Sequence, residues 1–478
     1  MRKRFEQQLS IGQKRIEDIE VNLKCRDAFP KLVLGLKKLY MTPEYNEKVF
    51  EILEAKILKD KKETGRPGMD LWQIFVLGQV RLALDISYDR LYHMANFDTL
   101  LRQLLGIENE SMFVERKELE YQNIIDNISL LDDQTLSQLN NIIVEMGHSV
   151  FKKKEEAPLH LKTDSFVVES NVHTPTDYNL LWDSARKTID CIEKLVEKYP
   201  QTKGWRKLYY WYKQLKNGCR AIGMSNKKNT NKKQVIEEYL EMAGLFSEKL
   251  KKEVVNLPME DEKDLQLQID LEYYMQMLAK HIDLLERRGI QDEKIPHSEK
   301  VFSIFETYTE MIIKGKQHPQ FELGKNVQIT TDQYNLIIDH KVMENEVDKS
   351  LVIPLADKVL QKYHVNSWSF DKGFFTKENK ELLQLFINNL IMPKKGKLNK
   401  AEYQQEHSKT FKKFRNKHSA IESNINELEY KGLDRCPDKG YAHFKNYIAM
   451  GICAYNLHRI GAELRRQQQE TLGLRKAA

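Results

Sequence analysis

The sequence predicts a mixed α/β fold in which a long helical block interrupts the sheet. Three observations support this prediction. Residues 159–168 alternate between apolar and polar side chains, and a period of two is typical of a β-strand. Strand patterns then disappear and return only in four later segments, at residues 326–331, 334–342, 366–371 and 389–392. Helical spacing at residues 349–363 and 376–386 separates the later strands, so strands and helices alternate there as in α/β domains.

The composition is that of a globular protein without a membrane segment. The chain has 478 residues, of which 41% are hydrophobic and 31% are charged, and this length allows two or three domains. No apolar run approaches the roughly 18 residues of a membrane helix, and the basic start lacks the apolar region of a secretory signal. The five cysteines form no CxxC pair, so neither a zinc site nor a disulfide framework is indicated. We therefore expect a cytoplasmic protein.

The N-terminal third is predicted to be helical. Residues 1–64 form a helical segment, which the Gly65-Arg66-Pro67-Gly68 break separates from a helical domain at residues 65–150. That domain opens with an apolar helix at residues 70–84 that Asp70 caps. Its further helices are expected at residues 88–95, 98–105 and 131–146. The short helices with a tight turn fit a DNA-binding helix-turn-helix or a plain helical bundle, and the pattern does not separate the two.

The rest of the chain is predicted to be a catalytic domain with a large helical insertion. Residues 151–183 and 318–460 supply the sheet, and residues 184–317 form the insertion. Helical spacing in and near the insertion covers residues 178–198, 232–254, 263–288 and 300–313. Two more helices are expected at residues 408–430 and 441–466, and residues 461–478 form a basic tail.

Three acidic residues occupy positions that suit a metal site. Asp164 lies in an otherwise apolar strand, and Asp371 ends the short strand 366–371. Glu422 lies on a polar stripe of helix 408–430, beside an apolar stripe made by Ile421, Ile425 and Leu428. Mg²⁺ prefers such oxygen ligands, and two such ions can catalyse displacement at a phosphodiester. The alternative is that the three are separate strand-end and surface carboxylates, and spacing alone leaves both interpretations open.

Two basic runs indicate a polyanionic partner. Residues 202–234 carry ten Lys and Arg and no acid, and residues 394–417 carry nine against two acids. Basic stripes with interleaved aromatics suit phosphate backbones and stacked bases, whereas a solvated helix face is the ordinary alternative. Trp205 and Trp211 are either base-stacking residues or core aromatics of the insertion. The DNA-binding candidates are Lys203, Arg206, Lys207, Lys213, Lys216, Arg220, Lys394, Lys395, Lys412, Lys413, Arg415 and His418.

Three motifs resemble those of bacterial insertion-sequence transposases of the DDE type. They are LKTDSFVVESNVHTPTDYNLLWD around Asp164, WSFDKGFFTKEN around Asp371, and FRNKHSAIESNINELEYKGLDRCPDKG around Glu422. The chain is most similar to the group termed "not classified yet" (ISNCY), and the resemblance also includes GRPGMDLWQIFVLGQVRLAL near the N-terminus. Relatives often carry a basic residue a turn or two after the glutamate. Here Asn426 and Glu429 occupy that stripe.

The resemblance implies both a fold and an activity. The fold is an RNase H-like catalytic domain, and Asp164, Asp371 and Glu422 are its catalytic acids, holding two Mg²⁺ ions or, alternatively, Mn²⁺. The partners are double-stranded DNA, as transposon ends and target, and further copies of the chain in a homodimer or higher oligomer at the bacterial nucleoid. The enzyme would cut the ends by hydrolysis and join the 3′-OH to target DNA. Alternatives are an RNase H-like nuclease that does not join strands and a DNA-binding derivative without activity.

Overall fold

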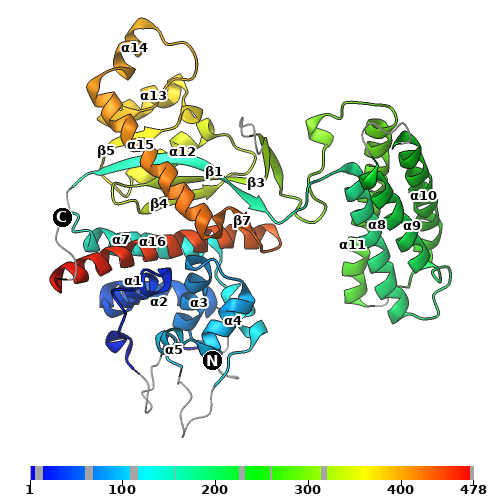
Figure 1. The fold of residues 1–478 in the computed structure, drawn as a ribbon, viewed down its shortest axis with the longest axis horizontal. Coiled ribbons are helices and arrows are strands. Elements are labelled where there is room, and N and C mark those ends of the chain that lie inside the picture. Colours follow the sequence, from blue (N-terminus) through cyan, green and yellow to red (C-terminus); the bar gives the residue numbers. More distant parts are fainter. Residues whose placement is uncertain are drawn as a thin grey trace. The chain divides into compact units, whose positions relative to one another are not determined.

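The structure, a computed structural model, describes residues 2–5, 14–59, 68–107, 117–154, 157–225, 232–258, 261–313 and 320–473 (Figure 1). It divides into two compact units. Unit 1 comprises Met1–Asn171 and Ile312–Ala478, and unit 2 comprises Val172–Met311. Unit 2 thus takes the place of the predicted insertion. No helix in the described ranges is both long enough and apolar enough to cross a bilayer.

A mixed β-sheet forms the centre of unit 1, which confirms the predicted mixed α/β fold. Strand β1 (Leu159–Ser170) pairs in antiparallel fashion with β3 (Phe321–Thr331), and β3 pairs likewise with β4 (Ile337–Val342). On its other side, β1 runs parallel to β5 (Val365–Phe370), which runs parallel to β6 (Asn389–Ile391). The two remaining strands described are β2 (Glu310–Ile313), which borders β3, and β7 (Arg435–Cys436), which pairs with the end of β1.

The two faces of the sheet differ in polarity because side chains alternate along each strand. On one face, Leu161 and Trp368 join a buried apolar core with helices α12 (Asp348–Leu360) and α13 (Lys377–Gln384). The opposite face carries His160 and Lys162 of β1 and Ser367 and Ser369 of β5. Helix α15 (Lys409–Leu428) packs against β1, β5 and β6, and α14 (Lys400–Glu406) precedes it. A polar layer therefore lies between α15 and the sheet.

The long helix α16 (Tyr441–Thr471) is the centre of the helical part of unit 1. It packs against α1, α3 and α7, all of which come from the first 150 residues (Figure 1). At the crossing with α1, a Cβ on Gly461 would overlap the main-chain oxygen of Lys31, so the two backbones are in direct contact. The N-terminal helices are α1 (Ala28–Met41), α2 (Pro43–Ile57), α3 (Leu71–Ala83), α4 (Tyr88–Phe97), α5 (Thr99–Leu104), α6 (Tyr121–Ile128) and α7 (Asp133–Val150).

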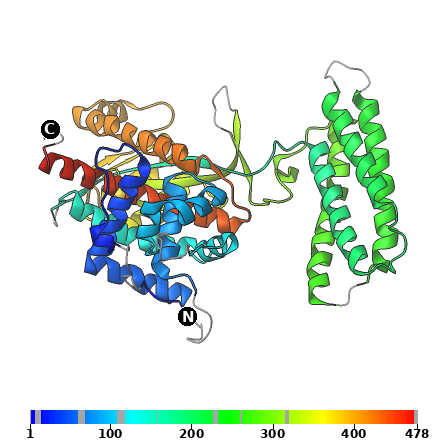
Figure 2. The same ribbon diagram turned by 60° about the horizontal axis from the view of Figure 1, so that its bottom comes forward.

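Unit 2 is a four-helix bundle (Figure 2). Helix α8 packs against α9 and α11, and α10 packs against the same two helices. Leu181, Tyr239, Phe246 and Leu278 lie in the common core. The helices are α8 (Asp177–Lys198), α9 (Leu208–Met224), α10 (Lys232–Glu253) and α11 (Glu262–Gly289).

Several local predictions are confirmed. Asp70 stands at the N-cap of α3, where the Gln73 side chain accepts a hydrogen bond from the Asp70 N–H at 3.2 Å. The apolar stripe of α15 is buried at Ile421, Ile425 and Leu428. The short helical turns are η1 (Ile16–Asp18), η2 (Val254–Asn256), η3 (His297–Glu299), η4 (Lys372–Phe374) and the π-type η5 (Glu429–Leu433).

Other predictions are wrong in instructive ways. Residues 300–313 do not form a helix, because the Ser303 hydroxyl accepts from the N–H groups of Phe305 and Glu306 in a turn and the segment ends in β2. Strand β4 begins at Ile337 rather than at residue 334, since Asn335 takes a positive φ of 61°. Residues 461–471 are not a free tail. They continue α16, where Arg466 pairs with Glu463 and Glu470.

Candidate catalytic site

Asp164 lies on β1, on the polar face of the sheet, and is half-buried. Its Oδ1 accepts a hydrogen bond from the Ser165 N–H at 2.8 Å, which holds the carboxyl in place on the central strand. Burial raises the pKa of Asp164 to about 7, and the negative charges of Asp371, Asp348 and Glu422 add to the rise, while the Ser165 hydrogen bond opposes it. The site therefore favours a cation or a proton at this carboxyl.

Asp371 follows β5 directly and is exposed. It caps the turn η4, where its Oδ2 accepts from the Gly373 N–H at 3.4 Å. Lys162 of β1 pairs in register with Ser369 of the parallel strand β5. Two residues further along each strand the chain reaches Asp164 and Asp371, so the two predicted acids reach the same edge of the sheet. The charge of Asp371 accordingly acts on Asp164.

Glu422 lies on α15 and is exposed. The buried stripe of Ile421 and Ile425 fixes the helix on unit 1, and the contacts of α15 with β1 and β5 set Glu422 beside the strand ends. Its charge also raises the pKa of Asp164. The charges of Asp371 and Glu422 thus both act on Asp164, although the three acids are distant in the chain.

A fourth carboxylate, Asp348, belongs to the same group and was not predicted. It is the first residue of α12, and its Oδ1 accepts a 2.8 Å hydrogen bond from the Ser165 hydroxyl. Burial raises the pKa of Asp348, and the charge of Asp371 adds to this. The predicted helix 349–363 places an acid at its N-terminus, but the sequence does not reveal that this terminus lies beside Asp164.

The donor set has the chemistry of a hard-cation site, because it consists of carboxylate oxygens. Close negative charges repel one another, and a divalent cation would relieve the repulsion that raises the pKa of Asp164. In their present rotamers, no three His, Cys, Asp or Glu side chains of the described residues are grouped to hold a metal ion. Asp371 and Glu422 are exposed, so their side chains are free to turn toward Asp164. The metal site itself stays a prediction.

The DNA-binding candidates of unit 1 differ in their availability. Lys395, Lys412, Lys413 and Arg415 are exposed, the last three on α15. The ammonium of Lys394 is instead engaged by both carboxylate oxygens of Glu402, at 2.8 and 2.9 Å. His418 is half-buried. Its Nδ1 lies 2.9 Å from the Ser369 hydroxyl, and its Nε2 has no hydrogen-bond partner in the described structure. Burial lowers the pKa of His418, so it is neutral near pH 7.

In unit 2, the basic stretch lies on the bundle surface. Lys203, Arg206 and Lys207 precede α9 and are exposed, as are Lys213 and Arg220 on the helix itself. Lys216 is half-buried against Tyr212. The interpretation of Trp205 as a base-stacking residue is wrong, because its ring is 2% exposed in the bundle core. Trp211 packs on Phe246 with ring centres 5.4 Å apart. Tyr209 and Tyr210 on α9, which are 77% and 47% exposed, are aromatics of this stretch that a ligand can reach.

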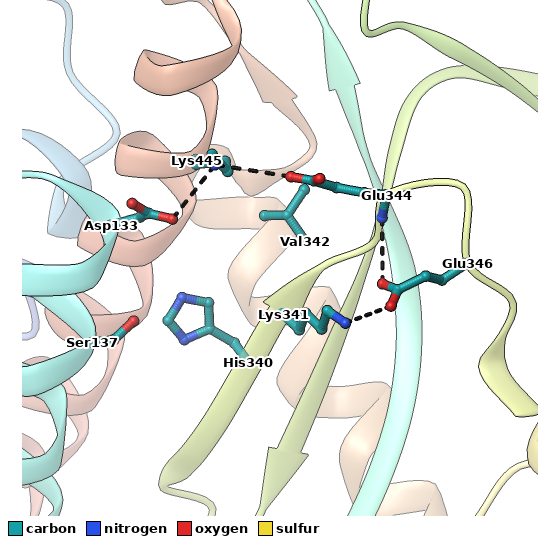
Figure 3. A pocket seen from close by; sticks show the side chains of 8 residues that line it. All are labelled: Asp133, Ser137, His340, Lys341, Val342, Glu344, Glu346 and Lys445. Carbon is teal, nitrogen blue, oxygen red and sulfur yellow. Dashed lines mark hydrogen bonds and ion pairs between the residues drawn. The ribbon is translucent and has the colours of Figure 1, made fainter. Parts of the chain in front are cut away.

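Unit 1 contains a cavity of about 480 Å³ between α7, β4 and α16 (Figure 3). None of the four carboxylates lines it. Its cations are matched by carboxylates: Lys341 pairs with Glu346 at 2.6 Å, and Lys445 lies 3.9 Å from Asp133 and from Glu344. Burial lowers the pKa of His340 at its centre to about 4, and the charge of Lys358 adds to this. The cavity is therefore charge-balanced. Its His340 lies two strands from Asp164 across the sheet, because both residues pair with Ile329 of β3.

Comparison with known proteins adds no relative from which a function can be transferred. No family model matches the chain, and neither a curated protein nor a solved structure matches it significantly. The carboxylate group at the end of the mixed sheet and the basic surfaces are therefore the observations from which a function has to be argued.

Proposed function

We propose that this chain is a DNA transposase of the DDE type. The observation that carries the proposal is that the charges of Asp371 and Glu422, which come from distant segments, act on Asp164 of the central strand, beside which β5 ends just before Asp371. Burial raises the pKa of Asp164 to about 7, with the charges of Asp371, Asp348 and Glu422 adding to the rise, and a carboxyl perturbed in this way is typical of a functional site rather than of a scattered surface acid.

The sheet supports the assignment to an RNase H-like domain. Three antiparallel strands, β4, β3 and β1, are followed by β5 and β6, which continue parallel to β1. This is the strand arrangement expected of an RNase H-like fold. The acids occupy the central strand, the end of its parallel neighbour and a later helix, as the motif resemblance implies. Unit 2 interrupts the chain between the first and second acids, where some DDE enzymes carry helical insertions.

In the proposed mechanism, Asp164, Asp371 and Glu422 would hold two Mg²⁺ ions, with Mn²⁺ as an alternative. Bound there, the ions would supply activation of the attacking oxygen and stabilisation of the leaving oxygen in the phosphodiester displacement. Asp164 fixes the geometry, because it lies on the central strand and its carboxyl is bonded to the Ser165 N–H. Asp371 and Glu422 are exposed, so they can adjust to the DNA strand and leave it access to the site.

The proposed substrate is double-stranded DNA carrying the ends of the chain's own element. The exposed cations on α15 and around α9 offer contacts to phosphates, which position DNA without reading its sequence. The protein is proposed to act as a dimer or higher oligomer, because two ends must be cut and joined. A helix-turn-helix role for α3, α4 and α5 stays part of this proposal.

The test is an assay of the full chain with DNA that carries the flanking inverted repeats, with Mg²⁺ and with Mn²⁺. The proposal expects cuts at the repeat ends and joining of the new 3′ ends to a target plasmid. Cutting without joining would favour the nuclease alternative, and specific binding without cutting would favour the inactive DNA-binding derivative. Either result would reject the transposase assignment.

A further inference from the structure

A second cavity lies on the polar face of the sheet, beneath α15, and its lining is rich in hydrogen-bond donors. Its volume is about 380 Å³, within the roughly 300–1,000 Å³ of small-ligand sites. The lining includes His160, Lys162, Ser367, Ser369 and Lys417. Among the described residues that line it, none is Asp or Glu. A cavity with two lysines and no carboxylate is suited to an anion.

The charge of Lys162 lacks a paired carboxylate. Lys162 is only 8% exposed, and its Nζ donates to the main-chain oxygen of Asp332 at 3.0 Å and to Asn335 Oδ1 at 3.4 Å, both neutral acceptors. The Asp332 carboxylate is engaged by His148 at 2.7 Å. Burial lowers the pKa of Lys162, although the negative charge of Asp332 opposes this. Because a buried charge is costly without a partner, an anion in the cavity would stabilise the ammonium.

Neutral polar groups and an aromatic ring also line the cavity. The Ser367 hydroxyl lies 2.7 Å from His160 Nδ1. The imidazole of His160 stacks on Phe414, with ring centres 6.0 Å apart and 28° between the planes. Lys417 is exposed and holds its Nζ 5.7 Å from the centre of the same ring. The cavity thus presents charge from two sides and a flat apolar surface beside it.

The contrast with the cavity of Figure 3 is informative. There, each lysine of the lining is matched by a carboxylate of the lining, so the cavity is charge-balanced without a ligand. Beneath α15, the lining leaves Lys162 and Lys417 with neutral neighbours. Only the second cavity therefore attracts an anion.

The cavity also lies next to the candidate acids along strands β1 and β5. His160, Lys162 and Asp164 follow one another on the same face of β1, and Ser367 and Ser369 precede Asp371 on β5. The register pairs His160 with Ser367 and Lys162 with Ser369. Two residues of a strand cover roughly 7 Å, so the cavity begins within about one nucleotide of the carboxylates.

We propose that this cavity binds a phosphate of an unpaired DNA strand, next to the phosphodiester that lies at Asp164 and Asp371. Lys162 and Lys417 supply the charge, the Ser367 hydroxyl supplies a hydrogen bond, and Phe414 offers a surface for the sugar or base. The identity of the strand rests on the proposed function, whereas anion binding rests on the cavity alone.

The experiment measures binding of a thymidine dinucleotide with a 5′-phosphate to the full chain, by calorimetry in EDTA. Inorganic phosphate and the unphosphorylated dinucleotide are the comparison probes. Lys417→Glu reverses the exposed cation, and Lys162→Gln removes the buried one. Lys377→Glu is the matched control, because Lys377 is exposed on α13, does not line the cavity and is not a DNA-binding candidate. Circular dichroism establishes that each variant is folded.

We expect the phosphorylated dinucleotide to bind more tightly than either comparison probe. We expect Lys417→Glu to weaken it about tenfold or more, and Lys377→Glu to leave it unchanged. Equal affinity of folded Lys417→Glu and the native chain, or an equal loss in Lys377→Glu, would overturn the proposal. Inorganic phosphate binding as tightly as the dinucleotide would overturn the assignment to a DNA strand. No cleavage is measured here, so an inactive chain would reject the proposed function and leave this result intact.

Discussion

The Ser165 hydroxyl donates a 2.8 Å hydrogen bond to Asp348, and this bond ties the N-terminus of α12 to the strand that carries Asp164. The neighbouring main-chain N–H of the same serine donates to Asp164 itself. One residue therefore positions two carboxylates that come from opposite faces of the sheet. The arrangement makes Asp348 a member of the acidic group rather than a helix-capping residue at a distance from it.

Asp348→Asn should weaken binding of Mg²⁺ or Mn²⁺ without unfolding the chain. The change keeps the size of the side chain and its acceptor for Ser165, but removes a negative charge beside Asp371. Residues that support metal ligands typically contribute about 10–100-fold in metal affinity, and we expect a loss in that range. Mn²⁺ titration by calorimetry measures it. The control is Asp357→Asn, since Asp357 lies exposed on the same helix. Equal losses in both variants would show that only net charge matters.

Asp164→Asn and Glu422→Gln should each abolish cutting and joining together while end-DNA binding is retained. Both changes remove a charge that holds metal, and phosphate contacts elsewhere supply the affinity. We expect a fall in cleavage on the order of 100-fold or more, at or above the largest losses seen for supporting residues. Gel assays of binding, cleavage and strand transfer on the same preparations provide the measurement. A variant that stays active would exclude the residue from the catalytic group.

Asp164→Asn should also change how stability depends on pH in the absence of metal. In an unfolded chain an aspartate titrates near pH 3.9, whereas the pKa of Asp164 in the fold is about 7. The favourable contribution of the protonated carboxyl is therefore complete below about pH 3.9 and is lost as pH rises through about 7. Asparagine does not titrate, so the variant should gain stability over the native chain up to about pH 7 and then keep that gain.

Urea midpoints in EDTA, compared between native and Asp164→Asn chains from about pH 5 to about pH 8, test this dependence. Asp357→Asn again serves as the control, and its difference from the native chain should not vary with pH. A constant difference for Asp164→Asn would mean that Asp164 titrates normally.

The basic stretch around α9 should contribute to DNA binding through charge alone. Reversing Lys203, Arg206 and Lys207 to Glu should weaken end binding and lower the slope of log affinity against log salt, by up to about 0.9 for each phosphate that the variant no longer neutralises. All three side chains are exposed, so folding should be retained. The control reverses Lys194, Lys252 and Lys294, which are exposed elsewhere in unit 2. Anisotropy titrations at several salt concentrations distinguish the two triple variants, and identical slopes would remove this surface from the DNA interface.

Gly461→Ala should destabilise unit 1, because its new methyl group would meet the backbone of α1 rather than a flexible side chain. Overpacking typically costs about 1–3 kcal/mol, and we expect a value at the upper end. Gly244→Ala in α10 is the control, since no atom lies within 4 Å of its added Cβ. That change should be neutral or stabilising by up to about 1 kcal/mol. Thermal unfolding midpoints test the contrast.

The sequence predicted correctly those elements that depend on interactions between residues near one another in the chain. The alternation in β1, the Asp70 cap and the apolar stripe of α15 follow from the periods of strands and helices. The helix predicted at residues 300–313 is wrong because the helical spacing of its apolar residues does not reveal that residues 310–313 pair with β3 as strand β2. The burial of Trp205 was also not predictable from local sequence. The neighbouring basic residues suggest an exposed position, but the ring lies in the core of the helical bundle.

The candidate site divides in the same way. The three acids were predicted because their motifs are recognisable along the chain, but Asp348 and the cavity under α15 depend on how segments meet. Asp348 approaches Asp164 only because α12, which follows β4 in the chain, begins beside Ser165 of β1. Lys162 and Ser369 face the same cavity only because of the register of β1 and β5. Neither relationship leaves a signal in one sequence.

The packing of α16 also has a consequence for how the protein folds during its synthesis. Helices α1, α3 and α7 leave the ribosome early, but the helix that covers their apolar sides is made roughly 300 residues later, a delay on the order of 15–60 s at ordinary rates of synthesis. During that time their apolar sides are open to chaperones and to other nascent chains. The N-terminal helices therefore complete their folding only after α16 has been translated.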